Sequence, residues 1–538
     1  MRKITISLLL ALGAVSAMGQ TINDALQISE NEYFGTARTM AMGNAFTALG
    51  GDPGSFGINP AGSAVARYSQ IAITPSISIA ATNAGFSADP LFDGFGADAR
   101  NTRTRLTLPN YGINMYLNTG KRSGLKGISF GFAGNATANY LDQVSAAGTN
   151  PYTSFMGEMA DGLSYAGIPY TQFSDHPSAN YYIGPPDETK PNWREALGWN
   201  TGMFFHPDGA DPTDYLATTE LSAYQQGGPL VQRWGRQTRG YKHDMVFNLG
   251  FNFSDKFFLG FNLGMVGMEM RKDSYLMEEA ANPSDFPNDF GDTRTYFTSG
   301  RLREYLTMDG SGIYGKVGII YVPTPAFRFG AAIQTPTLMN IHEYYQTAGS
   351  LEFTDSRFSA SDKTPQGEGD YSVISPLRVN VGAALNFGIG VVSVDYEMAD
   401  YSKMRFESTY SDPSAYDFRY ENEDIKNVYG MVHSLRAGIE FKPMQQLALR
   451  AGYNLSTVAE KDHDKDNAVR EAVSLGLGYS SRGAFFCDLA VRGSFRAKEY
   501  YRLYNDYMFI DESLAHASPM VKIGNTLFDI ALTVGWRF

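Results

Sequence analysis

The chain has 538 residues and a net charge of −12, with 19% charged residues, 13% aromatic residues and 56 glycines. Soluble proteins carry about 25% charged residues, and a nucleic-acid partner would need a basic face that this acidic chain lacks. The single cysteine, Cys487, excludes a disulfide framework and a cysteine-based metal site. Mean hydropathy is −0.25, and after residue 20 no apolar run approaches the ~18 residues of a membrane helix. Such a composition is typical of a membrane β-barrel, in which apolar and polar residues alternate.

Residues 1–19 are predicted to be a secretory signal peptide. Arg2 and Lys3 precede an apolar stretch at 4–15, and small residues stand at −3 and −1 of a cleavage site before Gln20. Cleavage after Ala17 is the alternative. The stretch is too short to anchor the mature chain in a membrane. We therefore expect an exported protein of the outer membrane of a didermic bacterium.

Alternation of apolar and polar residues predicts an all-β fold. The clearest segment is the C-terminus, where the apolar residues share one parity: Phe528, Ile530, Leu532, Val534, Trp536 and Phe538. Period two places them on one face, against lipid, and the intervening residues in a polar lumen. The same pattern predicts a 14-stranded antiparallel transmembrane β-barrel, with strands near 69–82, 104–118, 126–141, 240–253, 257–271, 305–322, 326–345, 371–387, 390–405, 428–442, 446–456, 470–480, 484–498 and 520–538.

Short and long connections alternate between these strands. Examples of the short ones are 254–256 and 388–389, whereas the longest is 142–239. In bacterial barrels the short turns are periplasmic and the long loops extracellular. We expect the barrel to occupy 69–538, with a long extracellular loop at 142–239, and residues 20–68 to form a separate N-terminal segment.

Small residues recur at helical spacing within the N-terminal segment. The spacing from Ala37 to Ala48 predicts a helix with a small-residue face, ended by Gly50 and Gly51 and followed by Pro53. Such a helix can pack inside a barrel without filling it. The alternative is an arm in the periplasm, which the many apolar residues of the segment disfavour.

Three motifs in this segment resemble the N-terminal hatch of the FadL/TodX family: Phe34-Gly35-Thr36-Ala37-Arg38, Ala41-Met42-Gly43-Asn44-Ala45-Phe46-Thr47-Ala48-Leu49-Gly50 and Asn59-Pro60-Ala61-Gly62. Residues 315–323 and 327–332 and the closing strand are also similar to that family. The resemblance implies an outer-membrane transporter of long-chain fatty acids or other hydrophobic molecules, with residues 20–68 as a hatch (plug) inside the lumen. It implies capture of the ligand at extracellular loops, movement of the hatch and lateral release into the bilayer.

The expected substrate path has three parts. The hatch part comprises Phe46, Phe56, Asn59, Pro60 and Ala61, and Asn59-Pro60-Ala61 is predicted to form a turn because Asn bonds its own backbone and the residue before Pro is extended. The capture part is an amphipathic turn in the long loop: Phe155, Met156, Met159 and Leu163. The alternative role of those four side chains is packing within the loop.

The third part is a lateral opening in the wall. Pro cannot donate to a strand ladder, and Pro75, Pro109 and Gly134 fall at nearly one height of three consecutive strands, with Gly131 a few residues below. Chance placement is the alternative. We expect a bulge or kink there, which forms a side opening towards the bilayer. The family resemblance points to the same third strand.

Charged residues of both signs occupy the lumen parity: Arg328, Arg378, Asp395, Glu397, Arg436, Glu440, Arg450, Asp488, Arg492, Arg496, Asp529 and Arg537. They are interpreted either as an ion-paired lumen that clamps the hatch or as partners of a ligand carboxylate. A further alternative for the whole protein is a FadL-like barrel that acts as a protein-docking component of a secretion system.

Catalytic motifs are weak. The G-x-S-x-G match around Ser129 and the G-x-G-x-x-G match at 310–315 both lie in predicted strands, where the chemistry requires a helix to follow. Asp462, Asp464 and Asp466 have calcium-like spacing, but the loop lacks the required glycine and the last ligand. We therefore expect no enzyme, cofactor or metal site. The expected partners are a hydrophobic small molecule and outer-membrane lipid, and the barrel is expected to be a monomer.

Overall fold

The protein is a closed 14-stranded antiparallel β-barrel, as the alternation predicted. It is described from a computed structural model that covers residues 21–86, 99–174, 181, 190–222, 225–409, 416–461, 469–496, 498–505 and 518–538. The predicted signal peptide and the acidic stretch at 462–466 lie outside these described residues. Strand β1 (Gln70–Phe86) pairs with the last strand, β24 (Met520–Arg537), and closes the ring.

The other wall strands follow in chain order, each paired with the next. They are β2 (Ala99–Asn118), β3 (Leu125–Asn150), β8 (Leu230–Phe253), β9 (Phe257–Ala280), β11 (Thr293–Tyr321), β12 (Phe327–Gln334) with β13 (Leu338–Phe353), β15 (Gly367–Ile374) with β16 (Arg378–Asn386), β17 (Gly390–Asp400) with β18 (Arg405–Ser408), β19 (Met431–Met444), β20 (Leu447–Thr457), β21 (Val469–Ser480), and β22 (Phe485–Phe495) with β23 (Glu499–Arg502). Four wall strands are thus each interrupted once, and Pro336 and Pro376 lie in two of the breaks.

A band of exposed apolar side chains surrounds the barrel. On three adjacent strands Met245, Met265 and Ile313 lie side by side and face outward. Above them on the same strands stand Tyr241 and Glu269, where the surface becomes polar. An outward apolar band beneath aromatic and charged residues is the lipid-facing surface of an outer-membrane barrel.

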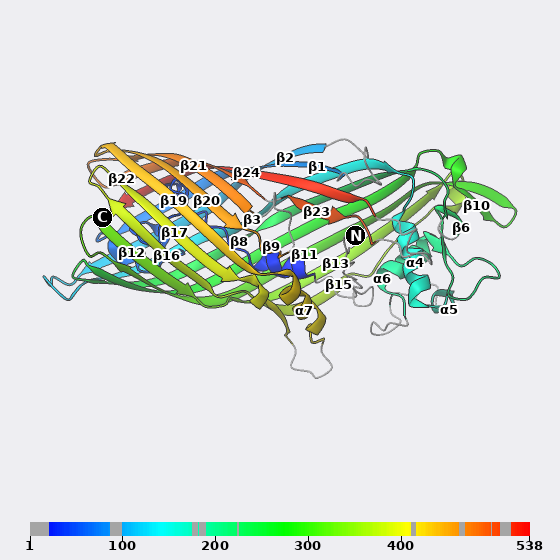
Figure 1. Ribbon diagram of the computed structural model, residues 1–538, viewed down its shortest axis with the longest axis horizontal. Helices are drawn as coiled ribbons and strands as arrows, with labels where there is room; N and C mark the ends of the chain where they lie inside the picture. The colour runs from blue at the N-terminus through cyan, green and yellow to red at the C-terminus, as the bar shows by residue number, and fades with distance from the viewer. Residues whose placement is uncertain are drawn as a thin grey trace, which may run out of the picture.

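The wall is much taller on one side than on the other. Strands β8, β9, β11 and β13 continue far beyond the apolar band, whereas β16, β17 and β19 to β22 end near α7 (Arg419–Val428) (Figure 1). The C-terminus lies at the end with the short turns. The tall strands carry the long loop at 142–239. This loop contains the helices α4 (Phe155–Ala166), α5 (Thr171–Ser174) and α6 (Trp193–Thr201) and the short strands β4 (Phe204–Phe205), β5 (Leu216–Ala217), β6 (Glu220–Ser222) and β7 (Gln225–Gln226). Two further short strands, β10 (Pro287–Phe290) and β14 (Ala360–Lys363), belong to later connections.

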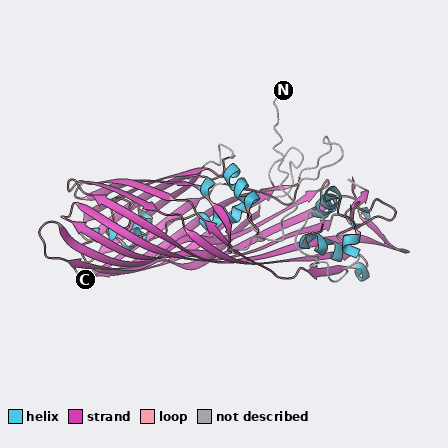
Figure 2. Ribbon diagram, turned by 90° about the horizontal axis from the view of Figure 1, so that it is seen from below, coloured by secondary structure: helices cyan, strands magenta, loops and turns pink. Residues whose placement is uncertain are grey.

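The remaining helical elements are short. In the N-terminal segment they are α1 (Ile22–Ser29), α2 (Ala37–Ala41), a 3₁₀ turn at Pro53–Ser55 and α3 (Gly62–Val65); further 3₁₀ turns occupy Pro283–Asp285, Ser356–Phe358 and Tyr401–Lys403. Figure 2 shows helices both within the strand wall and at the end far from the C-terminus. Within the described ranges, no helix combines the length and the apolar character that crossing a membrane requires.

Helix α2 is shorter than predicted. The expected helix extended to Ala48, but α2 ends at Ala41. The physical reason is the left-handed backbone at Gly43 (φ +62°) and Asn44 (φ +57°). An added Cβ at Gly43 would lie 2.9 Å from the Ala437 carbonyl oxygen. The chain therefore turns where it meets the wall and cannot continue as a helix.

Candidate functional site

The N-terminal segment lies inside the barrel and bonds to inward-facing side chains around its circumference. Side chains of six strands donate to its backbone carbonyl oxygens: Asn114 to Ser63 (3.0 Å), Asn248 to Pro60 (2.9 Å), Asn262 to Phe56 (2.7 Å), Lys316 to Gly57 (2.8 Å), Arg328 to Leu49 (3.0 Å) and Ser474 to Ala41 (3.2 Å). The Ala37 and Thr47 amides in turn donate to Thr533 and Asp395, each at 2.7 Å. An irregular buried backbone needs such partners, and the lumen wall supplies them.

Asn59, Pro60 and Ala61 form the predicted turn. The Asn59 Oδ1 accepts from the Ala61 amide at 3.0 Å, the self-bonding expected of Asn before Pro. The Asn59 Nδ2 donates to the Thr47 carbonyl at 2.7 Å and to the Ile319 carbonyl of the wall at 3.0 Å. One side chain therefore closes the turn and joins it to β11.

Lumen-facing glycines make room for this segment. An added Cβ at Gly260 would lie 2.2 Å from the Pro60 carbonyl carbon, and one at Gly318 would lie 2.0 Å from Asn59 Oδ1. Similar close approaches occur along other strands: Gly112, Gly131, Gly250, Gly330, Gly382, Gly438, Gly452 and Gly476. Many of the chain's glycines thus form a ring around the N-terminal segment, a role that composition alone did not indicate.

Inward charges clamp the segment to the wall. Arg38 of α2 donates to Glu440 at 3.0 Å, Glu440 also accepts from Arg450 at 2.7 Å, and Arg450 reaches Asp488 at 2.6 Å. All of these wall groups are buried. This chain of alternating charges matches the first of the two interpretations given to the lumen charges.

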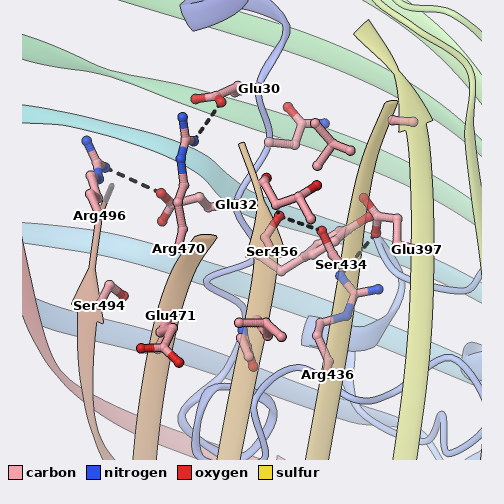
Figure 3. A pocket seen from close by; sticks show the side chains of 18 of the residues that line it. Glu30, Glu32, Glu397, Ser434, Arg436, Ser456, Arg470, Glu471, Ser494 and Arg496 are labelled. Atoms are coloured by element: carbon pink, nitrogen blue, oxygen red, sulfur yellow. Dashed lines mark hydrogen bonds and ion pairs between the residues drawn. The ribbon is translucent and has the colours of Figure 1, made fainter. Parts of the chain in front are cut away.

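A polar cavity of about 130 Å³ lies between the N-terminal segment and the shorter strands (Figure 3). Glu30 bonds to Arg470 at 2.6 Å, Glu32 to Arg496 at 3.4 Å and Glu397 to Arg436 at 3.0 Å across its lining. Charged side chains of both the N-terminal segment and the wall therefore line this cavity, together with apolar ones such as Val432 and Phe495. Among the described residues, no three His, Cys, Asp or Glu side chains gather as metal ligands would.

The wall is unzipped between β2 and β3. Their ladder runs from Asn118 opposite Gly127 to Asn110 opposite Asn135 and then stops. Beyond that height β2 stays paired with β1, and β3 stays paired with β8 as far as Asn150. The predicted interruption of the ladder is therefore present, and it begins at Pro109.

The residues expected to interrupt strand pairing, Pro75, Pro109 and Gly134, lie close to the predicted register. Pro75 occupies a bulge between Thr74 and Ser76, opposite the residues next to Pro109. Gly134 pairs with Tyr111, whose ring covers it so closely that an added Cβ would lie 2.2 Å from Cζ. β3 also bulges against β8 between Ala136 and Ala138. Gly131 faces the N-terminal segment, because its Cβ position lies 2.8 Å from the Phe56 ring.

Beyond the gap β3 passes inside β1 and β24. Its Val144 and Ala146 join a buried cluster with the inward-facing Ala84 of β1 and Val521 and Ile523 of β24. Carbonyl groups that left the ladder find other partners. The Glu32 amide of the N-terminal segment donates to the Thr137 carbonyl at 2.7 Å, and the Thr82 hydroxyl donates to the Gln143 carbonyl.

Side-chain hydrogen bonds span the gap instead of a ladder. Asn101 of β2 donates to the Ser145 hydroxyl of β3 at 2.9 Å, and two arginines of β2 reach β8. Arg105 of β2 donates to the Gly240 carbonyl of β8 at 2.7 Å, and Arg103 donates to the Thr238 carbonyl at 3.4 Å. Both acceptors belong to β8 residues that are still paired with β3, Gly240 with Tyr140 and Thr238 with Asp142. Side-chain contacts can separate without breaking a strand pair, so β2 and β3 can part here while their ladders with β1 and β8 persist.

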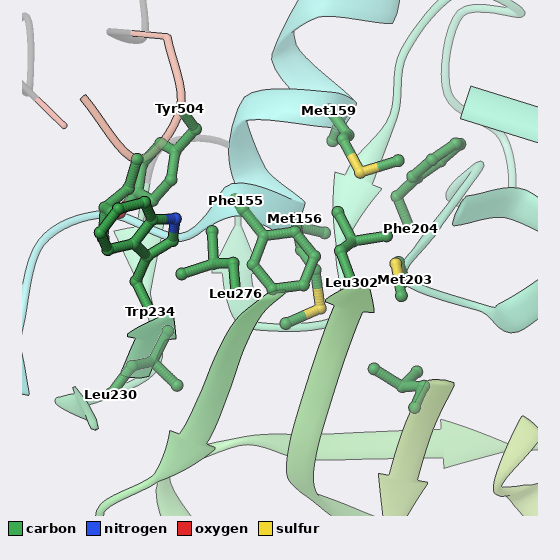
Figure 4. Close-up of a cluster of buried hydrophobic side chains, with 14 of the residues drawn as sticks. Phe155, Met156, Met159, Met203, Phe204, Leu230, Trp234, Leu276, Leu302 and Tyr504 are labelled. Carbon is green, nitrogen blue, oxygen red and sulfur yellow. The ribbon is translucent and has the colours of Figure 1, made fainter. Parts of the chain in front are cut away.

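The predicted capture residues are packed inside the long loop. Phe155, Met156, Met159 and Leu163 are all buried and contact Phe204, Leu276 and other apolar side chains (Figure 4). They do not form an exposed surface in this structure. Capture by these side chains would require α4 to separate from the strands beneath it, and it stays a prediction.

The two catalytic-motif matches have structural roles. Ser129 lies in β3 and bonds to the Ser63 hydroxyl at 2.8 Å. Residues 310–315 lie within β11, a continuous strand. Neither has the helix that its chemistry requires.

Helix α6 of the long loop is expected to become less stable as pH rises. Burial raises the pKa of Glu195, at the start of α6, to about 7, although the Asn192 amide and Arg194 oppose the shift. A raised carboxyl pKa costs no stability below the unfolded value of about 4.5; the cost grows between pH 4.5 and 7 and is complete above pH 7. We expect hydrogen exchange in α6 to be roughly tenfold faster at pH 8.5 than at pH 5.5, after correction for intrinsic rates. Glu195→Gln should remove most of this difference; an equal pH response in that variant would contradict the assignment.

No family model matches the chain, and no curated protein matches it. Among solved structures, the toluene transporter TodX of P. putida matches with a TM-score of 0.51 and 14% identity, over 95% of this chain and 99% of that one. A FadL homologue of Pseudomonas aeruginosa matches with a TM-score of 0.50 and 11% identity, over 94% and 99%. At such identities the similarity is one of fold. The chain therefore has the outer-membrane barrel fold of the FadL/TodX transporters.

Proposed function

We propose that the protein takes up long-chain fatty acids or other hydrophobic small molecules through the outer membrane and releases them sideways into the bilayer, acting as a monomer. The observation that carries this proposal is the combination of a blocked axis and an unzipped wall. Residues 20–68, the hatch, bond to strands around the lumen, whereas β2 and β3 share no ladder beyond Asn110 and Asn135. TodX, of the same fold, is a toluene transporter.

The energetics suit an apolar ligand. Each CH₂ group removed from water contributes about 0.8 kcal/mol, so six to eight methylenes would contribute roughly 5–6 kcal/mol before ordering costs. That amount permits both capture and release. A ligand that leaves through the wall enters lipid directly and does not cross the periplasmic water.

In the proposed route, the ligand first displaces loop helices at the mouth. It then enters the lumen above the hatch, and movement of the hatch opens the way to the gap. The Thr137 carbonyl in the gap is bonded by the Glu32 amide, so a shift of the hatch would also change the edge of β3. For passage the two arginines must separate from β8, and the Asn101 amide must separate from the Ser145 hydroxyl.

Crosslinking the gap tests the proposal. In a Cys487→Ser background, Arg105→Cys and Tyr241→Cys place thiols on β2 and β8, beside the Arg105–Gly240 bond. A short reducible bis-maleimide should lower cellular uptake of radiolabelled oleate at least tenfold relative to the uncrosslinked variant. Reduction should restore uptake, and binding at the surface should persist throughout.

A matched pair provides the control. Tyr275→Cys and Arg303→Cys lie opposite each other on β9 and β11, which are already joined by a ladder. Crosslinking them should leave uptake unchanged. Unimpaired oleate uptake in the fully crosslinked Arg105→Cys, Tyr241→Cys variant would show that ligands do not leave between these strands.

A further inference from the structure

Two arginines face each other on the outer surface of the wall, beside the gap. Arg239 of β8 is the direct cross-strand partner of Arg271 of β9, and both side chains are exposed. Like charges placed directly opposite each other destabilise a sheet. Arg271 bonds to Glu269 at 2.8 Å, whereas Arg239 forms no ion pair among the described residues. This part of the outer surface therefore carries an excess of positive charge.

Two further arginines reach the same place from the other side of the gap. Arg105 and Arg103 of β2 donate to the carbonyl oxygens of Gly240 and Thr238, the two residues that flank Arg239 in the chain. Neither arginine forms an ion pair within the part of the chain that the structure describes. Cations from three strands thus gather where β2 and β3 share no ladder. The gap arginines, as this cluster is termed below, are Arg103, Arg105, Arg239 and Arg271.

The carboxylates near this cluster already have partners. Glu269 bonds to Arg271, as described above. Asp142 of β3 bonds to Arg236 at 3.2 Å and accepts from the amide of Thr238 at 3.0 Å. Asp244 of β8 is buried. The gap arginines therefore outnumber the carboxylates that could neutralise them.

The gap arginines lie at the boundary between the apolar band and the polar surface above it. Met245 and Tyr241 are exposed on β8 just below Arg239, and Leu106, next to Arg105 on β2, is 75% exposed. This boundary is on the side away from the short turns, which is the extracellular side of a bacterial barrel. Arginine can keep its apolar stem against hydrocarbon while its charge reaches the headgroups. The headgroups of outer-leaflet lipids lie at this height.

We propose that the gap arginines bind a phosphate group of an outer-leaflet lipid, which lies across the outside of the gap and links β2 to β8 and β9. The forked guanidinium group matches the oxygen atoms of a phosphate in pairs. Clusters of cations at a membrane surface attract anionic lipids. The inference goes beyond the proposed uptake function and does not depend on it.

The surroundings favour a lipid over a free phosphate ion. Leu106 and Met245 expose apolar surface next to the cluster, and the acyl chains of a bound lipid would lie against it. A phosphate that accepts from arginines on both sides of the gap also adds a link that the chain itself lacks. Beyond Asn110 and Asn135, β2 and β3 have no ladder to hold them together. The bound lipid would therefore stabilise the wall at its interruption.

Native mass spectrometry of the detergent-purified protein tests the proposal. Diphosphorylated lipid A is the probe, and its dephosphorylated form is the control probe. Arg239→Gln with Arg271→Gln should bind the phosphorylated probe at least tenfold more weakly than the wild type. Binding of the dephosphorylated probe should stay within twofold. Both side chains are exposed, so the barrel of this variant should fold.

A second variant tests the link across the gap. Arg103→Gln with Arg105→Gln removes the two charges that β2 contributes. It should also weaken binding of the phosphorylated probe at least tenfold. An unchanged affinity in this variant would show that β8 and β9 hold the lipid without β2, and it would overturn the proposed link.

Two arginines of the same tall part of the wall provide the matched control. Arg233 of β8 and Arg303 of β11 are already paired with carboxylates, at 3.1 Å and 2.6 Å. Arg233→Gln with Arg303→Gln should leave the affinity for both probes within twofold. An equal loss in this variant would show a general attraction of charge and would overturn the site.

Three further outcomes would contradict the proposal. The first is equal affinity of the wild type for the two probes, because the phosphate would then contribute nothing. The second is unchanged affinity in Arg239→Gln with Arg271→Gln. The third is full competition by millimolar inorganic phosphate, which would assign the affinity to the free ion and not to a lipid. No transport step enters this assay, so it can fail while the crosslinking test succeeds, and the reverse.

Discussion

Gly260→Val should force the hatch out of its seat and open the barrel. The added side chain would begin 2.2 Å from the Pro60 carbonyl carbon and 2.3 Å from the Ala61 nitrogen, both backbone atoms. Backbone cannot yield as the end of a flexible side chain can, so the clash should cost about 3 kcal/mol. The expected result is rapid proteolysis within the hatch and entry of large hydrophilic antibiotics into cells.

Gly267→Val is the matched control for this experiment. Gly267 lies on the same strand, and nothing comes within 4 Å of a Cβ added there. This variant should keep the hatch protected and the cells impermeable. If Gly260→Val cells exclude the antibiotics as well as the control does, the Pro60 turn does not hold the hatch against β9.

Glu440→Gln should also loosen the hatch, by the loss of a charge and not by a steric clash. Glu440 is buried and accepts from Arg38 of α2 at 3.0 Å and from Arg450 at 2.7 Å. Arg450 keeps Asp488, but among the described residues Arg38 has no other ion pair. Leaving a fully buried charge without its partner costs about 3–5 kcal/mol, and Arg38, whose side chain is 23% exposed, should lose less than that. We expect hatch proteolysis to accelerate, with a barrel that still folds and inserts.

An exposed pair supplies the comparison for the charge removal. Arg405 and Glu407 are about half-exposed, and such surface pairs contribute about 0–1 kcal/mol. Glu407→Gln should therefore have no measurable effect on the hatch. A double variant, Arg38→Met with Glu440→Gln, should be more stable than Glu440→Gln alone. Equal proteolysis rates in the wild type and Glu440→Gln would show that the Arg38–Glu440 ion pair does not hold the hatch.

Much of the barrel could be predicted because its signal is local. A strand in lipid must alternate in polarity at every second residue, and that rule needs no knowledge of the neighbouring strand. Phe528 to Phe538 could therefore be assigned to lipid, and Arg378 or Glu440 to the lumen. The break at Pro109 was predictable for the same reason, since a missing amide is a property of the residue itself.

Prediction was poorer wherever the environment was not lipid. Strand β11 begins at Thr293, twelve residues before its predicted start, because above the apolar band no lipid imposes the alternation. Phe155 and Met156 could be assigned to the long loop but not to its buried core. Helix α1 was missed altogether, although Thr21 and Asp24 form a capping signal that could have indicated it.

By itself the sequence determined the class of fold, the number of strands, the faces of each strand and the height of the break in the wall. Each of these depends on residue type and on separations of a few positions. Only the tertiary structure decided that β3 passes inside β1, that Arg38 meets Glu440, and that α1 ends on Lys242 and Arg378. Those contacts join residues between 61 and 402 positions apart, and closure of the barrel brings them together.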